Sequence, residues 1–145
     1  MNGIELAKLK LSNALNIFSK AIFPVYLFNE SRMPIFIGTC FAFEYKGRGY
    51  LVTAAHVLDQ CKHGSLKIAS TSQEEMIGVE GFWHIVDPKV QSREVDPFDF
   101  AWHQLSEKEM ASLPTLATDL LENDYSSVVG TRILTAIGFP VSKNK

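Results

Sequence analysis

Residues 23–53 constrain the fold most strongly, because short apolar runs alternate there with polar, glycine-bearing segments. Residues 23–28, 35–45 and 50–53 are rich in aromatic and β-branched side chains, which favour a pleated strand. The tetrapeptide Lys46-Gly47-Arg48-Gly49 predicts a hairpin turn, since glycine readily adopts the positive φ that such turns require. Gly38 lies inside the second run and suggests a bulge or a point of close approach. Short strands joined by such turns predict an antiparallel barrel or sandwich.

The rest of the chain divides into segments of different character. Two weaker strands are expected at 66–69 and 76–85, followed by a loop at 87–97 and a further strand at 100–105. A polar stretch at 106–130, with a short helix before Pro114, reads as a surface linker, and 131–138 again resembles a strand. One strand cannot bury its own face, so we interpret 131–145 as the start of an incomplete second β unit. The expected organisation is therefore a helix at 1–22, a β domain at 23–105, a linker at 106–130 and a truncated unit at 131–145.

The N-terminal segment has helical periodicity. Apolar residues recur at spacings of three and four and would lie on one face of a helix: Ile4, Ala7, Leu11, Ala14, Leu15, Phe18, Ala21 and Ile22. We favour a helix that packs across its own domain, because its charge pattern is no richer than that of an ordinary solvated face. A helix that binds a membrane surface or a partner is the alternative.

Composition excludes several classes of protein. With 145 residues, 46% of them hydrophobic, the chain is one ordinary globular domain rather than a disordered one. A formal net charge of −2 argues against nucleic-acid binding driven by counterion release. No segment is apolar enough to span a bilayer and no signal peptide is recognisable, so we expect a cytoplasmic protein, with an export signal upstream of this sequence left open.

The residues that point to chemistry are a histidine and the strands around it. Gly38-Thr39-Cys40-Phe41 begins a strand pair that leads through the hairpin to Thr53-Ala54-Ala55-His56. Small side chains at 54 and 55 allow close packing, and a histidine at the end of a strand can be aimed by a rigid sheet. Histidine titrates near neutral pH, so it can take a proton from a hydroxyl nucleophile and return it to a leaving group.

In these motifs the sequence resembles the trypsin-like (chymotrypsin-fold) serine peptidases, particularly their bacterial branch. Gly38-Thr39-Cys40-Phe41 and Thr53-Ala54-Ala55-His56 match two family motifs in order and spacing, and Asp99-Phe100-Ala101-Trp102 resembles the segment that carries the family's aspartate. Gly138-Phe139-Pro140 is similar to the opening strand of the second barrel. The resemblance covers roughly residues 23 to 140.

The resemblance implies a fold and an activity. The fold would be mostly β: an antiparallel six-stranded β-barrel, the first of a double barrel, with the N-terminal helix in front and an incomplete second barrel behind. The activity would be hydrolysis of a peptide or protein substrate by a Ser-His-Asp triad, with no metal and no organic cofactor. His56 would be the general base and acid, and Asp99 its orienting carboxylate. Asp96 is the competing carboxylate, disfavoured because it precedes Pro97 and lacks the apolar-Ala-apolar continuation that follows Asp99.

The nucleophile of the family has no counterpart here. No Gly-x-Ser-Gly occurs, and none of the serines after Asp99 has glycines placed for an oxyanion hole: Ser106, Ser112, Ser126, Ser127 and Ser142. We therefore expect a truncated peptidase, inactive alone, whose missing C-terminal barrel is its intramolecular partner in a full-length protein. The alternatives are a non-catalytic peptide- or protein-binding module on the same barrel, and an unrelated β-barrel with a satisfied core histidine.

The remaining cysteines and histidines give weaker signals. Cys40 and Cys61 are interpreted as free thiols rather than a disulfide, and Cys40 as too enclosed in its strand to be a nucleophile. Cys61 with His63 is at most half a zinc site, because zinc requires three or four ligands. His84 and His103, each beside a tryptophan, are expected to be partly buried and hydrogen-bonded rather than metal ligands.

Overall fold

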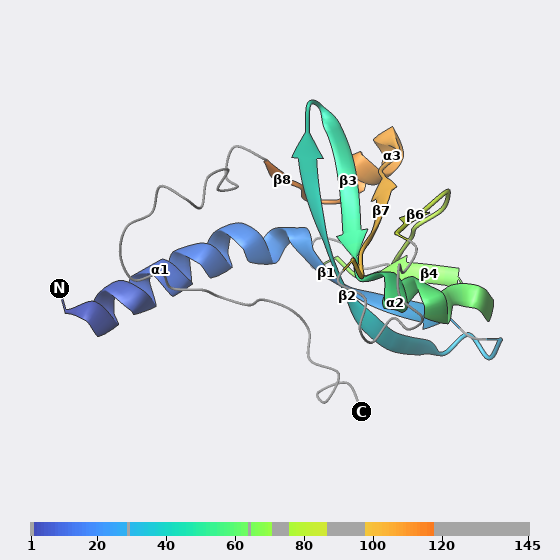
Figure 1. Ribbon diagram of the computed structural model, residues 1–145, viewed down its shortest axis with the longest axis horizontal. Coiled ribbons are helices and arrows are strands. Elements are labelled where there is room, and N and C mark those ends of the chain that lie inside the picture. Colours follow the sequence, from blue (N-terminus) through green and yellow to red (C-terminus); the bar gives the residue numbers. More distant parts are fainter. Residues whose placement is uncertain (1, 29, 64, 71–75, 87–97, 118–145) are drawn as a thin grey trace.

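A computed structural model describes residues 2–28, 30–63, 65–70, 76–86 and 98–117 (Figure 1). These residues form a mostly antiparallel sheet that curls into a half-barrel, with one long helix at the N-terminus. The loop expected at 87–97, with Asp96, and the strand expected at 131–138 lie outside the described residues.

The sheet has eight strands in the described part of the chain. Their bounds are β1 (Ile22–Phe28), β2 (Pro34–Tyr45), β3 (Arg48–Thr53), β4 (Ser65–Ile68), β5 (Ile77–Gly78), β6 (His84–Ile85), β7 (Ala101–Gln104) and β8 (Leu116–Ala117). The hydrogen-bonded order is β5-β4-β1-β2-β3-β7-β6, and β8 pairs in parallel with β2. Among these strands β5 and β6 do not pair with each other, so the described sheet is an open half-barrel rather than a closed ring.

The expected strands are largely confirmed, with one region divided. β1 to β4 and β7 coincide with predicted strands to within two residues at each end. The predicted strand at 76–85 is instead two short strands, β5 and β6. Gly81 lies between them with φ +117°, a conformation that a continuous strand of L-residues does not adopt. The positive φ at Gly81 therefore explains why this run is interrupted.

The hairpin between β2 and β3 is confirmed, but its turn is shorter than predicted. Lys46 and Gly47 both have positive φ, +50° and +73°, as a two-residue turn between antiparallel strands requires. Gly49 already belongs to β3 and serves packing instead. A Cβ there would lie 2.8 Å from Cγ of Met110, so glycine lets the helix α3 (Glu107–Ser112) approach the sheet.

The hydrophobic core lies inside the curl of the sheet and is closed at one end by the helix α2 (Ala55–Asp59), which continues into η2 (Gln60–His63). Buried residues of the strands, of α2 and of the segments that directly follow β5, β7 and α3 form one cluster: Phe23, Val25, Cys40, Ala42, Leu51, Ala55, Val57, Leu58, Leu66, Ile68, Val79, Ala101, Leu105 and Leu113. Apolar side chains this enclosed are the main source of folding free energy. The cluster therefore holds α2 and β7 in fixed positions.

The helix α2 packs against the sheet at Gly38 of β2. Val25 pairs with Gly38 and Tyr26 with Phe36, so the register shifts there and confirms the predicted bulge. A Cβ on Gly38 would lie 2.6 Å from Cγ2 of Val57, closer than packed atoms tolerate. The glycine also confirms the predicted close approach.

The segment interpreted as a surface linker contributes to the core where it is described. The predicted helix before Pro114 is present as α3, capped by Ser106, which accepts the amide of Glu109 while the Glu109 carboxylate accepts the amide of Ser106. Leu113 and Leu116 are buried, and β8 extends the sheet. At least residues 106–117 are thus part of the folded body.

The N-terminal helix α1 (Gly3–Phe18) corrects one interpretation. It begins with a capping box formed by Asn2 and Glu5, and η1 (Ser19–Ala21) connects it to β1. No residue of α1 is buried, and the helix extends away from the sheet (Figure 1). The expectation that it packs across its own domain is therefore wrong, because periodicity reveals an apolar face but not what covers that face. Within the described residues no helix has the length and apolarity to cross a membrane.

Replacement of Gly38 by alanine tests the contact between α2 and the sheet. The added methyl group has to displace Val57 or the strand, and overpacking of this kind costs about 1–3 kcal/mol. We expect Gly38→Ala to lower the free energy of unfolding by that amount in urea denaturation. Gly78→Ala is the matched control, since a Cβ there meets nothing within 4 Å and its φ is not positive. Equal effects of the two substitutions would contradict the close contact.

The carboxylate of Glu109 gives a pH-dependent test. It accepts hydrogen bonds from the amide (2.7 Å) and the hydroxyl (2.8 Å) of Ser106. Burial alone raises the pKa of Glu109, but these hydrogen bonds and the neighbouring His103 outweigh burial and lower the pKa. Because the folded pKa lies below the unfolded value, the carboxylate stabilises the fold above the unfolded pKa, and this contribution is lost as the pH falls through the folded pKa.

We therefore expect Glu109→Gln to destabilise the protein by about 1–3 kcal/mol at neutral pH and by progressively less as the pH falls below about 4. Urea denaturation at a series of pH values measures the difference. Glu107→Gln, at an exposed position of the same helix, is the control and should change little at any pH. A difference between Glu109→Gln and the parent that is independent of pH would refute the assignment.

Candidate functional site

The pairing of β3 with β7 brings the two ends of the candidate site together. Thr53, the last residue of β3, lies opposite Ala101, the first residue of β7. In an antiparallel pair, the residues that follow one strand and those that precede the other share one edge of the sheet. His56 follows β3 by three residues and Asp99 precedes β7 by two. The 43 residues that separate them in sequence are thus bridged by one strand ladder.

Asp99 holds His56 at two points. Its Oδ2 lies 2.5 Å from Nδ1 of the His56 ring, and its Oδ1 accepts the backbone N–H of the same residue at 2.9 Å. The two oxygens of one carboxylate are thereby both engaged by one residue, which fixes the rotation of the carboxylate and the plane of the ring. The structure thus brings together the two residues that the sequence singled out.

The backbone contact arises from the way α2 begins. The first amides of a helix have no partner within the helix, and the side chain of the N-cap residue commonly accepts one of them. Here the N-cap is Ala54, which has no acceptor. Asp99 supplies the acceptor from across the sheet edge and bonds the amide of His56. Ala55, the residue before His56, is fully buried, and its small side chain lets α2 lie close to the strand ends.

The arrangement defines which ring nitrogen is available for chemistry. A carboxylate oxygen only accepts, so Nδ1 of the neutral ring carries the hydrogen and Nε2 carries the lone pair. The His56 side chain is 56% exposed and that of Asp99 24% exposed. Among the described residues Nε2 has no hydrogen-bond partner. The ring can therefore accept a proton at Nε2 from an approaching group, while Asp99 stabilises the imidazolium that forms.

An apolar cavity adjoins the carboxylate. It has a volume of about 440 Å³ and runs from Phe18 and Ala21 past Thr39 and Phe41 to Asp99. The strand ends after β3 and before β7 form part of its wall. A hydrophobic group of a ligand could occupy this cavity next to Asp99.

A row of aromatic side chains crosses the same sheet and was not recognised from the sequence. Phe43 stacks on Tyr50 with centroids 5.4 Å apart, Tyr50 meets Trp102 edge to face at 5.9 Å, and Trp102 stacks on His84 at 3.8 Å. These residues come from four strands, so only the register of the sheet places them in contact. Alternation within each strand was the available signal, but it does not say which rings of different strands are neighbours.

The other histidines lie outside the His56 pair. His103 is buried, with Nδ1 3.0 Å from the carbonyl of Phe82 and Nε2 3.4 Å from the Glu109 carboxylate. The expected hydrogen bonding of His103 is confirmed, and the residue is more deeply buried than the partial burial predicted. For His84 the expectation of partial burial is wrong: its side chain is exposed and stacks on Trp102. The Ser106 hydroxyl next to His103 donates to Glu109 and is not available as a nucleophile there.

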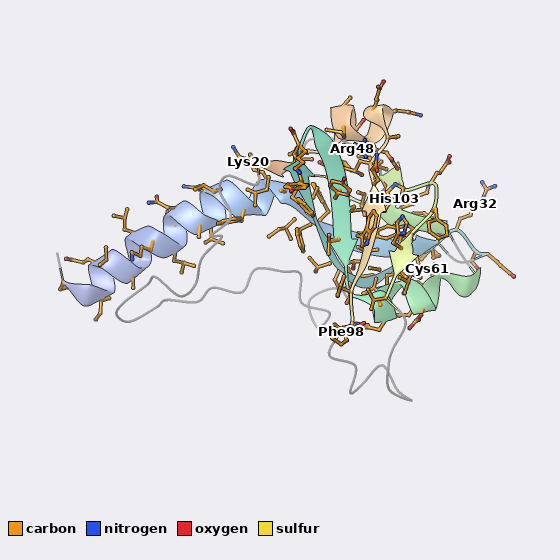
Figure 2. All side chains as sticks on the ribbon, turned by 45° about the horizontal axis from the view of Figure 1, so that its top comes forward. Lys20, Arg32, Arg48, Cys61, Phe98 and His103 are labelled. Carbon is orange, nitrogen blue, oxygen red and sulfur yellow. The ribbon has the colours of Figure 1, made fainter. Side chains whose placement is uncertain are left out.

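The two cysteines are free thiols, as expected. Burial raises the pKa of Cys40, so this thiol stays protonated and is a poor nucleophile. Burial also raises the pKa of Cys61, whose side chain (labelled in Figure 2) lies in η2 and contacts the carbonyl of Val57 at 3.7 Å. Nowhere in the described ranges do three or more His, Cys, Asp or Glu side chains gather in a way that could hold a metal ion.

Comparison of the chain with protein-family models, with curated proteins and with solved structures gives no match. No family is therefore identified by similarity, and the functional interpretation depends on the local geometry of His56 and Asp99.

Replacement of Asp99 by asparagine tests the two-point contact directly. Asparagine can accept the backbone amide through its oxygen but then presents its NH₂ group to Nδ1, which favours the tautomer with the hydrogen on Nε2. We expect long-range ¹H–¹⁵N correlation spectra to show the hydrogen of the neutral ring on Nδ1 in the parent and on Nε2 in Asp99→Asn. Glu107→Gln is the control and should leave the tautomer unchanged. The same tautomer in parent and Asp99→Asn would contradict the contact.

Proposed function

We propose that His56 and Asp99 are the general base and the orienting carboxylate of a serine-type endopeptidase that hydrolyses peptide bonds. The observation that carries this proposal is the two-point hold of His56 by Asp99, through Nδ1 at 2.5 Å and the backbone amide at 2.9 Å. An exposed ion pair formed for stability alone does not need such an orientation, because most surface pairs contribute little. A base that must aim one nitrogen at a substrate does need it.

The proposed chemistry uses the free nitrogen of the ring. Nε2 of His56 takes the proton of a serine hydroxyl as the oxygen attacks the carbonyl carbon of the peptide bond. The imidazolium, stabilised by Asp99, then gives this proton to the amine that leaves when the C–N bond breaks. Water hydrolyses the acyl group from the serine in a second round, in which His56 again acts first as base and then as acid.

The serine and the oxyanion donors are assigned to polypeptide outside these residues. No Gly-x-Ser-Gly occurs in the sequence, and the described serines are not bonded to Nε2 of His56. In this proposal a second barrel, consistent with the resemblance to trypsin-like peptidases, would supply both groups and most of the substrate pockets. Because the nucleophile and oxyanion hole are major contributions to the rate, the chain alone is expected to be inactive.

The proposal is tested by replacing His56 with alanine in a form of the protein that carries the nucleophilic serine. Loss of the base should lower kcat/KM for a peptide substrate by about a thousandfold or more, with an unchanged thermal unfolding midpoint. The drop should appear in kcat, since the proton transfer occurs only in the transition state.

Two controls accompany this measurement. His84→Ala removes another exposed histidine that does not contact Asp99 and should retain activity. The 145-residue chain should show no burst of serine acylation with an activated ester. Retained hydrolysis in a folded His56→Ala variant would contradict the assignment of His56 as the general base. Binding of the peptide without hydrolysis by the parent would favour a non-catalytic peptide-binding module. Stoichiometric acylation of a serine in the 145-residue chain would contradict the claim that the nucleophile lies outside it.

A further inference from the structure

The helix α1 presents apolar side chains that the described part of the protein does not cover. Ile4 is 70% exposed, and Leu11 and Leu15 are each 42% exposed, although all three belong to the periodic apolar face. The side chains of α1 project away from the sheet and the other described elements along most of the helix (Figure 2). Apolar groups left in water on this scale mark a surface that binds something.

The distribution of residues around α1 is that of a helix lying in an interface. At 3.6 residues per turn, one sector contains apolar and small side chains: Ile4, Ala7, Leu11, Ala14, Leu15 and Phe18. Leu6 and Ile17 lie outside this sector, beyond Lys10. The opposite sector contains Glu5, Ser12, Asn13 and Asn16, with Leu9 as its one large apolar member. The sixteen residues of α1 form a helix about 24 Å long. A helix of this length can lie along a surface but is too short to span a bilayer.

The charge of the helix selects the chemistry of that surface. Lys8 and Lys10 lie on opposite flanks of the apolar sector, and Lys20 follows in η1. Glu5 is the sole acidic residue of α1, and its carboxylate is engaged by the amide of Asn2 at 2.9 Å. The segment is thus basic although the whole chain has a net charge of −2. Lysines at the flanks of an apolar sector can extend toward anionic headgroups while the sector itself enters the acyl region.

A second copy of the helix suits this surface less well. The spacing 4, 7, 11, 14, 18 follows a heptad pattern, but Ala7 and Ala14 occupy alternate seam positions and fill little space. The helix covers only about two heptads, fewer than the three or four that sustain a coiled coil. Two copies would also bring their lysines together without acidic partners.

We propose that α1 is a docking helix that binds in the plane of an anionic lipid surface, with its apolar sector in the lipid and Lys8 and Lys10 at the headgroups. Burial of the apolar sector and attraction of the lysines to anionic headgroups both contribute to such binding. The capping box at Asn2 and Glu5 stabilises the first turn of this helix. The proposal is independent of the chemistry at His56.

Vesicle flotation of the full chain tests the proposal. The protein should float with vesicles of phosphatidylcholine mixed with phosphatidylglycerol, should remain below vesicles of phosphatidylcholine alone, and should be released by high salt. Lys8→Gln with Lys10→Gln should weaken binding to the anionic vesicles about twenty-fivefold, at about a factor of five per lysine.

A matched pair of leucine substitutions tests the apolar sector. Leu11→Ser removes a leucine from the sector and should weaken binding about tenfold or more. Leu9→Ser makes the same change at a similarly exposed position on the polar side, where it should alter binding by less than about twofold. Because neither residue is buried, both variants should unfold at the temperature of the parent.

Three results would overturn the proposal. One is an absence of binding to anionic vesicles, or equal binding to the zwitterionic ones. Another is an equal effect of Leu9→Ser and Leu11→Ser. A third is a dimer in analytical ultracentrifugation that Leu11→Ser dissociates while vesicle binding is absent, which would assign the surface to a second copy.

Discussion

The register between β3 and β7 is the constraint on which the candidate site depends. Thr53 opposite Ala101 sets the distance between the segment that follows one strand and the segment that precedes the other. A slip of one residue would turn every side chain of β7 to the other face of the sheet, bringing Trp102 into the core and Ala101 out of it. The full burial of Ala101 beside the partly exposed Trp102 penalises that slip. The encounter of His56 with Asp99 is therefore a consequence of core packing.

The same dependence explains why the site can be both exposed and well oriented. An ion pair with a side chain 56% exposed contributes little to folding free energy, because water competes for both partners. The geometry of the pair is set by packing in the interior, where Val57 contacts Gly38 and Ala55 is buried. The close contact of Val57 with Gly38 holds α2 against the sheet. Orientation at the surface is thus maintained by contacts in the interior.

Features encoded locally were predictable from the sequence, and those that depend on distant contacts were not. The hairpin at 46–47 and the strands β1 to β3 follow from nearby turn residues and apolar runs. The parallel pairing of β8 with β2 has no local signal, and the periodicity of α1 shows an apolar face without its partner. His84 and His103 have similar neighbours in sequence, yet one is exposed and the other buried, because they lie at different positions of the sheet.

For the candidate site, the two side chains were predictable from the order of their motifs, but the second contact, to the backbone amide of His56, was not. It depends on Ala54 being unable to cap α2, which becomes meaningful only when Asp99 is known to lie at that edge. The contacts of the aromatic row were not predictable for the same reason, because its rings are neighbours only through the pairing of different strands.

The central position of Cys40 has a consequence for the chemical durability of the protein. Its side chain is 1% exposed on β2, which is bonded on both sides, by β1 and β3. Oxidants and alkylating reagents require access and a thiolate, and the folded state offers neither. Modification of this sulfur must therefore wait for the strands around it to separate. The rate at which the free thiol of Cys40 is lost under oxidative stress would therefore measure how often the centre of the sheet opens.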